Sequence, residues 1–139
     1  MENILTDAGI WYALFDPRDQ YYAQAQEKAQ YLDLFHIVLP WPILYETLRT
    51  RLVRNVASLR SFEAYLSRPH ITYLEDASYR NAALELSMDS SLNRARPLSL
   101  VDCVLRLMLE DVNIKIDYLI TFNVGDFSDV CRTRGIEII

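Results

Sequence analysis

Short apolar runs that favour β-structure alternate along this chain with longer stretches of helical periodicity, and this alternation restricts the fold more than any other feature. We expect strands at residues 3–6, 36–39, 71–74, 118–121 and 136–139. We expect helical stretches at residues 8–15, 20–34, 42–52, 56–66, 76–92, 100–112 and 127–134. Strands that alternate with helices form a parallel sheet with helices on both faces. The predicted fold class is therefore α/β with a central, mostly parallel sheet.

The length of 139 residues is typical of one domain, and no repeat, low-complexity tract or Gly/Ser-rich linker divides the chain. We expect a single domain over residues 1–139. No run approaches the roughly 18 apolar residues of a membrane span. Glu2 stands where a signal peptide would carry positive charge. Cys103 and Cys131 each lie in an apolar helical pattern, which argues against a disulfide framework. These features predict a cytoplasmic protein without a membrane segment.

The formal net charge of −5 is unfavourable for a protein that contacts phosphates, because phosphate neutralisation needs Lys and Arg. Of the 14 basic residues, however, all except Lys28 and Lys115 are arginines, whose planar guanidinium suits phosphate. Several of them lie in one window that holds no acidic residue: Arg49, Arg51, Arg54 and Arg60. This window is either a solvated helix face or a surface for phosphates, and charge alone does not decide between them.

Four acidic residues stand where an α/β fold places its ligand-binding groups. Asp7 directly follows the first strand, and Asp126 comes after the strand at residues 118–121. Glu46 lies between apolar neighbours near the start of a helix, and Asp102 lies at the mouth of a strongly apolar helix. Parallel sheets bind their ligands beyond the carboxyl ends of the strands, where the strand order reverses. The topology therefore predicts that these acids gather in one region.

Each of these acids also has a purely structural explanation. Asp7 and Asp126 suit the N-caps of following helices, Glu46 suits the first turn of a helix, and Ser99 with Asp102 has the spacing of a capping box. As a group they are harder to explain in this way, because converging carboxylates repel one another unless a cation neutralises them. Oxygen ligands without nearby His or Cys indicate Mg²⁺ or Mn²⁺ rather than Zn²⁺.

Other chemistries have little support in the sequence. His36 and His70 form no ligand pair with each other or with a cysteine. Three glycines are too few for a phosphate-binding glycine loop. No Gly-x-Ser-x-Gly segment is present, so a serine hydrolase of that kind is excluded.

The segments around the four acids resemble the motifs of PIN-domain proteins. In chain order they are ILTDAG at residues 4–9, PILYETL at residues 42–48, LSLVD at residues 98–102 and TFNVGDF at residues 121–127. The likeness runs from Asn3 to Ile139. It implies a three-layer α/β/α fold and an acidic, Mg²⁺-dependent site that cuts single-stranded RNA. The residues that it assigns to catalysis and metal binding are Asp7, Glu46, Asp102 and Asp126.

The resemblance implies a role for each residue of the site. Asp7 and Asp102 would be the principal metal ligands, while Glu46 and Asp126 would hold water molecules of the metal and help to deprotonate one of them. The residues expected to orient these carboxylates are Ser99, Thr121 and Asn123. The residues expected to contact the RNA backbone are Arg49, Arg51 and Arg54.

The best-known bacterial members of this family are VapC-type toxins, which are inhibited by a cognate antitoxin and are commonly dimeric. The resemblance therefore implies an antitoxin partner and a homodimer. Two positions depart from the family pattern: Ala8 replaces the usual Thr or Ser, and Asn123 stands where many members have Asp. The sequence leaves open whether Asn123 or Asp126 faces the metal. The alternative functions are an inactive PIN-like binding module, a PIN nuclease of RNA processing, and one that cuts DNA.

Overall fold

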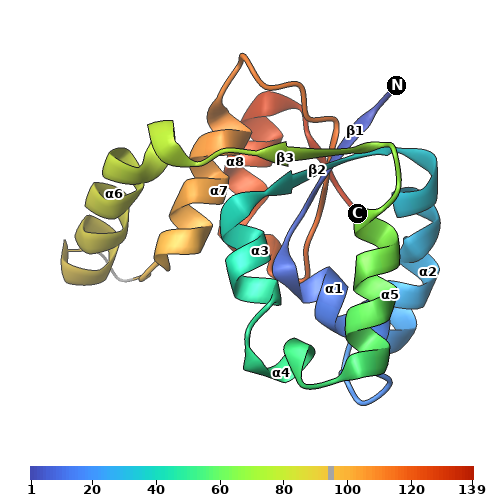
Figure 1. Ribbon diagram of the computed structural model, residues 1–139. Coiled ribbons are helices and arrows are strands. Elements are labelled where there is room, and N and C mark those ends of the chain that lie inside the picture. Colours follow the sequence, from blue (N-terminus) through green and yellow to red (C-terminus); the bar gives the residue numbers. More distant parts are fainter. Residues whose placement is uncertain (94–95) are drawn as a thin grey trace.

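Five parallel strands form the centre of the protein in a computed structural model, which describes residues 1–93 and 96–139. The strands are β1 (Asn3–Thr6), β2 (His36–Pro40), β3 (Ile71–Leu74), β4 (Tyr118–Ile120) and β5 (Glu137–Ile138). They make one sheet in the order β3-β2-β1-β4-β5, and every neighbouring pair is parallel (Figure 1). The prediction of an α/β fold around a parallel sheet is confirmed.

The strand order reverses at β1, which lies in the middle of the sheet. From β1 the chain builds outward through β2 and β3, and it then returns to the other side of β1 to form β4 and β5. Leu5 of β1 consequently pairs with Val38 on one side and with Leu119 on the other. The backbone N–H of Asp7 donates to the carbonyl oxygen of Ile120 at 3.2 Å. The carboxyl ends of β1 and β4 therefore form the switch point at which such sheets bind ligands.

Helices cover the sheet on both sides, which gives three layers (Figure 1). The helices near the first half of the sheet are α1 (Ala8–Phe15), α2 (Tyr22–Leu34), α3 (Trp41–Thr47), α4 (Thr50–Val53) and α5 (Val56–Leu66). The later ones are the 3₁₀ turn η1 (Ala77–Tyr79), α6 (Arg80–Asn93), α7 (Leu100–Glu110) and α8 (Val124–Arg134). In Figure 1, α1, α2 and α5 lie on one side of the sheet, and α6, α7 and α8 lie on the other.

The prediction of a single helix over residues 42–52 is wrong, because the helical structure is interrupted between α3 and α4. Arg49 is extended, with φ −79° and ψ 176°. Its Nε donates to the carbonyl oxygen of Glu46 at 3.1 Å, and the hydroxyl of Tyr12 donates to the same oxygen at 2.6 Å. These side chains satisfy a carbonyl that would otherwise lack a partner at the end of α3, so the helix ends at Thr47.

The predicted start of the last helix is also wrong, because α8 begins at Val124 rather than at Phe127. Asp126 therefore lies in the first turn of a helix and not in the preceding loop. The N–H of Asp126 donates to the carbonyl oxygen of Asn123 at 3.0 Å, which closes that turn. The helix ends at Arg134, because Gly135 has φ 69° and occupies the left-handed region that ends many helices.

An aromatic cluster joins α1 to α5 at the centre of the core. The ring of Trp11 is fully buried and lies 5.0 Å from that of Phe62 and 5.5 Å from that of Tyr65, between ring centroids. A smaller apolar cluster that includes Met108 and the buried free thiol of Cys103 packs α7 against α6. Among the described residues, no helix combines the length and the apolar character needed to cross a membrane.

Candidate active site

A pocket of about 520 Å³ opens at the switch point of the sheet, and acidic side chains from three elements line it. Asp7 comes from the end of β1, Glu46 from the last turn of α3, and Asp102 from the first turn of α7. Ser99 and Asn123 also line this pocket, which we call the acidic pocket. Residues far apart in the sequence are thus brought together as the strand order predicts.

Asp7 is the most firmly held of these acids. Its Oδ1 accepts a hydrogen bond from the N–H of Ala8 at 2.7 Å, so it caps α1. Its Oδ2 accepts from the hydroxyl of Thr121 at 2.8 Å, and that hydroxyl in turn accepts from the N–H of Asn123 at 3.0 Å. Asp7 therefore is a helix cap and also carries an oriented carboxylate, and Thr121 contributes to that orientation.

Asp102 and Glu46 are held less tightly and are partly exposed. Ser99 is the N-cap of α7, and its hydroxyl oxygen accepts from the N–H of Asp102 at 3.1 Å. The capping contact at this helix start thus uses the backbone of Asp102. The backbone of Glu46 is fixed by Tyr12 and Arg49 through its carbonyl oxygen. Both carboxylates consequently lie at anchored backbone positions.

The acids of this site interact electrostatically. Burial raises the pKa of Asp7, and the charge of Asp126 adds to that rise against the opposing hydrogen bond from Thr121. Burial also raises the pKa of Glu46, with further contributions from the charges of Asp7 and Asp102. The pKa of Asp102 is raised by burial first and then by the charges of Asp7 and Asp126, against a hydrogen bond from Ser99 that lowers it. The ionised carboxylates thus destabilise one another in the absence of a cation.

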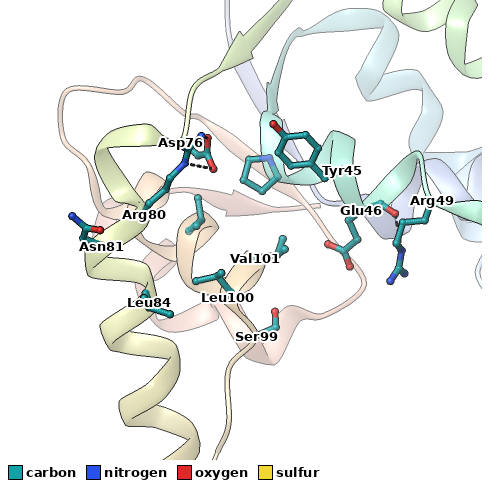
Figure 2. Close-up of a pocket in the computed structure, with 12 residues that line it drawn as sticks. Tyr45, Glu46, Arg49, Asp76, Arg80, Asn81, Leu84, Ser99, Leu100 and Val101 are labelled. Atoms are coloured by element: carbon teal, nitrogen blue, oxygen red, sulfur yellow. Dashed lines mark hydrogen bonds and ion pairs between the residues drawn. The ribbon is translucent and has the colours of Figure 1, made fainter.

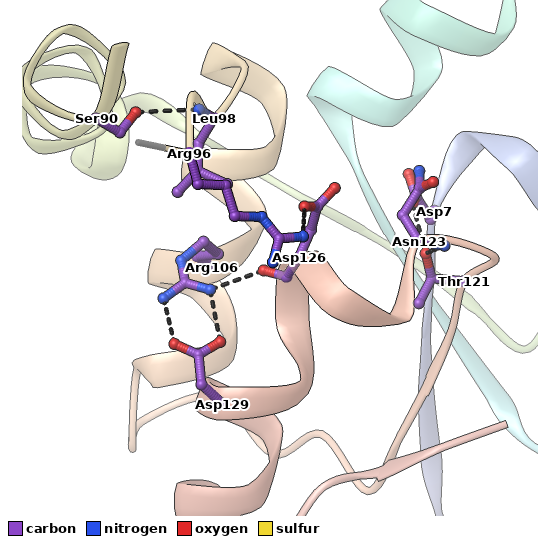
Figure 3. A network of polar contacts seen from close by, with 9 residues as sticks. All are labelled: Asp7, Ser90, Arg96, Leu98, Arg106, Thr121, Asn123, Asp126 and Asp129. Atoms are coloured by element: carbon purple, nitrogen blue, oxygen red, sulfur yellow. Dashed lines mark hydrogen bonds and ion pairs between the residues drawn. The ribbon is translucent and has the colours of Figure 1, made fainter. Parts of the chain in front are cut away.

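Asp126 does not line the acidic pocket. It lines a second pocket of about 410 Å³ together with Arg96 and Arg106. An oxygen of its carboxylate forms an ion pair with the guanidinium of Arg96, as Figure 3 shows. The structure therefore gathers three of the four candidate acids around one cavity and places the fourth at its margin, close enough for its charge to influence Asp7 and Asp102.

The chemistry of the acidic pocket fits a hard divalent cation such as Mg²⁺. Its candidate donors are carboxylate oxygens, and no His or Cys is among the described residues that line it. A cation between Asp7, Glu46 and Asp102 would offset their mutual repulsion. Within residues 1–93 and 96–139, no three Asp, Glu, His or Cys side chains are already arranged to share a metal ion.

The predicted RNA-contacting arginines lie in different surroundings. Arg49 and Arg51 line the acidic pocket, whereas Arg54 lines a separate pocket of about 390 Å³. Arg51 is also engaged by Asp16, with an N–O distance of 2.6 Å. The charge of Arg49 acts on one of the acids, because it lowers the pKa of Glu46 against the effect of burial.

Sequence reasoning did not identify two residues that contact the site. Tyr12 lines the acidic pocket and anchors Glu46, which is 34 positions away. Arg96 binds Asp126 across 30 positions. Neither residue belongs to a local pattern that includes its partner, because each contact is created by the packing of separate elements. No signal in the single sequence pointed to either of them.

Comparison with known proteins identifies the fold. No protein-family model matches the sequence, and no curated protein matches it either. The structure is similar to VapC20 of Mycobacterium tuberculosis, described as a toxin that cleaves the sarcin-ricin loop, with TM-score 0.67 and 21% identity over 91% of this chain and 93% of that one. It is also similar to a chain of VapBC2 from Rickettsia felis, whose crystal structure holds a DNA fragment of the promoter. That likeness has TM-score 0.60 and 11% identity, over 99% of this chain and 97% of that chain. The chain therefore has a VapC-type PIN-domain fold, as its motifs predicted.

Proposed function

We propose that this protein is an endoribonuclease that hydrolyses phosphodiester bonds of single-stranded RNA with Mg²⁺ or Mn²⁺ as its cofactor. The observation that carries the proposal is the meeting of Asp7, Glu46 and Asp102 in one pocket at the switch point of the sheet. Carboxylates that repel one another there favour a divalent cation, and such a cation attracts a phosphate. The fold shared with VapC20, a toxin that cleaves the sarcin-ricin loop, supports the same conclusion.

The residues of the pocket have distinct roles in this reaction. A bound Mg²⁺ would supply positive charge that polarises the phosphate and lowers the pKa of a water molecule. Asp7 and Asp102 would be its principal ligands, and Asp7 is already oriented by Thr121. Glu46 is suited to accept a proton from the attacking water, since burial and neighbouring charges raise its pKa. Asn123 would hydrogen-bond to a carboxylate from the start of α8.

The RNA backbone would approach the acids along the side that carries Arg49. Figure 2 shows Glu46 and Arg49 at one end of a groove whose opposite wall includes Leu84 and Leu100. This groove has a volume of about 600 Å³ and shares Glu46, Arg49 and Ser99 with the acidic pocket. A guanidinium beside the cleavage site is suited to a phosphate next to the one that is cut. Arg51 and Arg54 would extend this contact along α4.

We further propose that the protein is the toxin of a toxin–antitoxin pair, that it acts in the cytoplasm and that it forms a homodimer. The VapC-type fold supports the toxin role. The two free thiols suit a reducing compartment. Leu84, Met88 and Leu92 form an exposed apolar stripe on α6, which favours self-association. Growth arrest on expression would support the toxin role, and a monomeric mass by light scattering would contradict the homodimer.

The first expected result concerns metal removal. Purified protein should cut a single-stranded RNA in Mg²⁺ or Mn²⁺ and should lose this activity in EDTA, because the carboxylates of the pocket can hold a divalent cation but cannot polarise a phosphate themselves. The measurement is cleavage of a labelled RNA beside a DNA of the same sequence. An Asp7→Asn variant purified in parallel controls for contaminating nuclease. Cleavage that persists after confirmed metal removal would refute the metal-dependent mechanism. Faster cleavage of the DNA than of the RNA would refute the assignment of RNA as the substrate.

The second expected result distinguishes the role of Asn123 from that of Asp126 in metal binding. Asp126→Ala should reduce RNase activity more than Asn123→Ala at limiting Mg²⁺, because only Asp126 supplies a full negative charge. The deficit of Asp126→Ala should shrink as Mg²⁺ is raised, since part of it is metal affinity. Initial rates over a Mg²⁺ titration test both statements. If Asn123→Ala is the less active variant, Asp126 is only a first-turn acid of α8 and the amide of Asn123, which lines the pocket, has the metal-facing role.

A further inference from the structure

Arg96 binds the one candidate acid that the structure places outside the acidic pocket. Its guanidinium forms an ion pair with Oδ1 of Asp126. In Figure 3, Asp126 lies between Arg96 and the part of the site that carries Asp7. The side chain of Asp126 is 23% exposed in this pair, while that of Arg96 is 61% exposed. The carboxylate is thus held by a cation that reaches it from the solvent side.

The backbone of Asp126 is fixed independently by Arg106 of α7. Nη1 of Arg106 donates to the carbonyl oxygen of Asp126 at 2.7 Å. The same guanidinium forms a bidentate pair with Asp129, with N–O distances of 2.8 and 2.7 Å. These contacts hold the first turn of α8 against α7 without the help of Arg96. Loss of Arg96 would therefore release the carboxylate of Asp126 and leave its backbone in place.

The guanidinium of Arg96 lies against the backbone of Gly125. A Cβ atom at Gly125 would meet Nη2 of Arg96 at 3.0 Å and Nη1 at 3.5 Å. A side chain at this position would therefore push the guanidinium, which is the far end of a long flexible side chain, a few tenths of an ångström away. Gly125 lies within α8 and its φ is not positive, so its backbone accepts alanine. Gly125→Ala thus offers a way to move Arg96 without changing the charge of the protein.

We propose that Arg96 is a positioning residue that holds the Asp126 carboxylate at the margin of the acidic pocket and competes with the divalent cation for it. This rests on the proposed function, because it requires a cation in the pocket. A carboxylate engaged by a guanidinium attracts a second cation less strongly. Arg96 therefore sets how readily Asp126 contributes its charge to the metal bound beside Asp7 and Asp102.

The test is Mn²⁺ binding to the full-length protein without RNA, measured by isothermal titration calorimetry. Arg96→Gln should bind Mn²⁺ more tightly than the wild type by up to about fivefold, which is the factor that an exposed ion pair contributes. Gly125→Ala, which only shifts the guanidinium, should change the affinity in the same direction by a smaller factor. Arg132→Gln is the matched control, because Arg132 lines the same pocket and carries the same charge. It should leave the affinity unchanged. In an Asp126→Asn background, Arg96→Gln should have no further effect.

Each other outcome overturns the proposed competition between Arg96 and the cation. Weaker Mn²⁺ binding by Arg96→Gln would mean that Arg96 presents Asp126 to the metal. Equal affinity would reduce the pair to a surface contact, and an equal gain in Arg132→Gln would assign the effect to net charge. If neither the wild type nor any variant binds Mn²⁺, the proposed function fails together with this inference. Thermal melts without metal establish that every variant is folded.

Discussion

Asp102→Asn should reduce RNase activity by more than about 100-fold, the upper limit expected when only a partner of a metal ligand is lost, and leave the protein folded. The structure explains why folding should survive. The cap of α7 is formed by the hydroxyl of Ser99 and the backbone N–H of Asp102, and the substitution removes neither. The charge of Asp102 favours the helix dipole by about 0.3–1 kcal/mol. The substitution removes this favourable contribution, but it also removes the repulsion of the Asp102 charge by Asp7 and Asp126, so the two effects partly cancel. The free energy of unfolding without metal should therefore change by less than about 1 kcal/mol.

Ser99→Ala provides the matched comparison for Asp102→Asn. It removes the cap of α7 and should lower the free energy of unfolding by about 0.5–2 kcal/mol. It should nevertheless lose less activity, because the carboxylate of Asp102 remains. Thermal melts without metal and RNase rates, corrected for the folded fraction, measure both effects. If Asp102→Asn instead destabilises the fold like Ser99→Ala and cuts RNA at the normal rate, Asp102 serves only the start of the helix.

Trp11→Ala should be the most destabilising single substitution considered for this protein. Trp11 is fully buried and touches the rings of Phe15, Phe62 and Tyr65. Removing a buried Trp side chain typically costs about 3–5 kcal/mol, which is a large part of the stability of a domain. The indole N–H also donates to the hydroxyl of Thr6 at 3.1 Å. The melting temperature should fall by about 10–20 °C.

Two variants separate packing from hydrogen bonding at Trp11. Trp11→Phe keeps a ring in the cluster and loses the bond to Thr6, so it should cost about 1–2 kcal/mol. Trp41→Ala removes the other tryptophan, which is only partly buried against Tyr45 and Tyr73, and should cost less than Trp11→Ala. Denaturant unfolding of the metal-free protein measures all three. A cost below about 1 kcal/mol for Trp11→Ala would contradict the assignment of this cluster as the core.

Local sequence determined the bounds of a helix or strand where the residues that begin or end it are close together in the chain. The predicted ranges at residues 3–6, 56–66 and 71–74 agree with β1, α5 and β3. α5 begins where Asn55 caps the N–H of Ser58, and α8 ends where Gly135 adopts a left-handed conformation. Such signals act over a few residues and can be identified in a single sequence. The early end of α3 was not readable from such signals alone, because Tyr12, which lies 34 positions away, donates to the carbonyl oxygen of Glu46.

The alternation of strands and helices therefore determined the fold class, and acids after a strand or within a helix identified three residues that line one pocket. Only the tertiary structure decided how the four candidate acids are held. The hydrogen bond from Thr121 to Asp7 spans 114 positions, and the ion pair of Arg96 with Asp126 spans 30. The first contact exists because β4 lies next to β1. The hydrophobic pattern of a buried parallel strand is the same whichever neighbours it has. Strand order, and with it the partner of each acid, is consequently determined by packing between elements distant in the sequence.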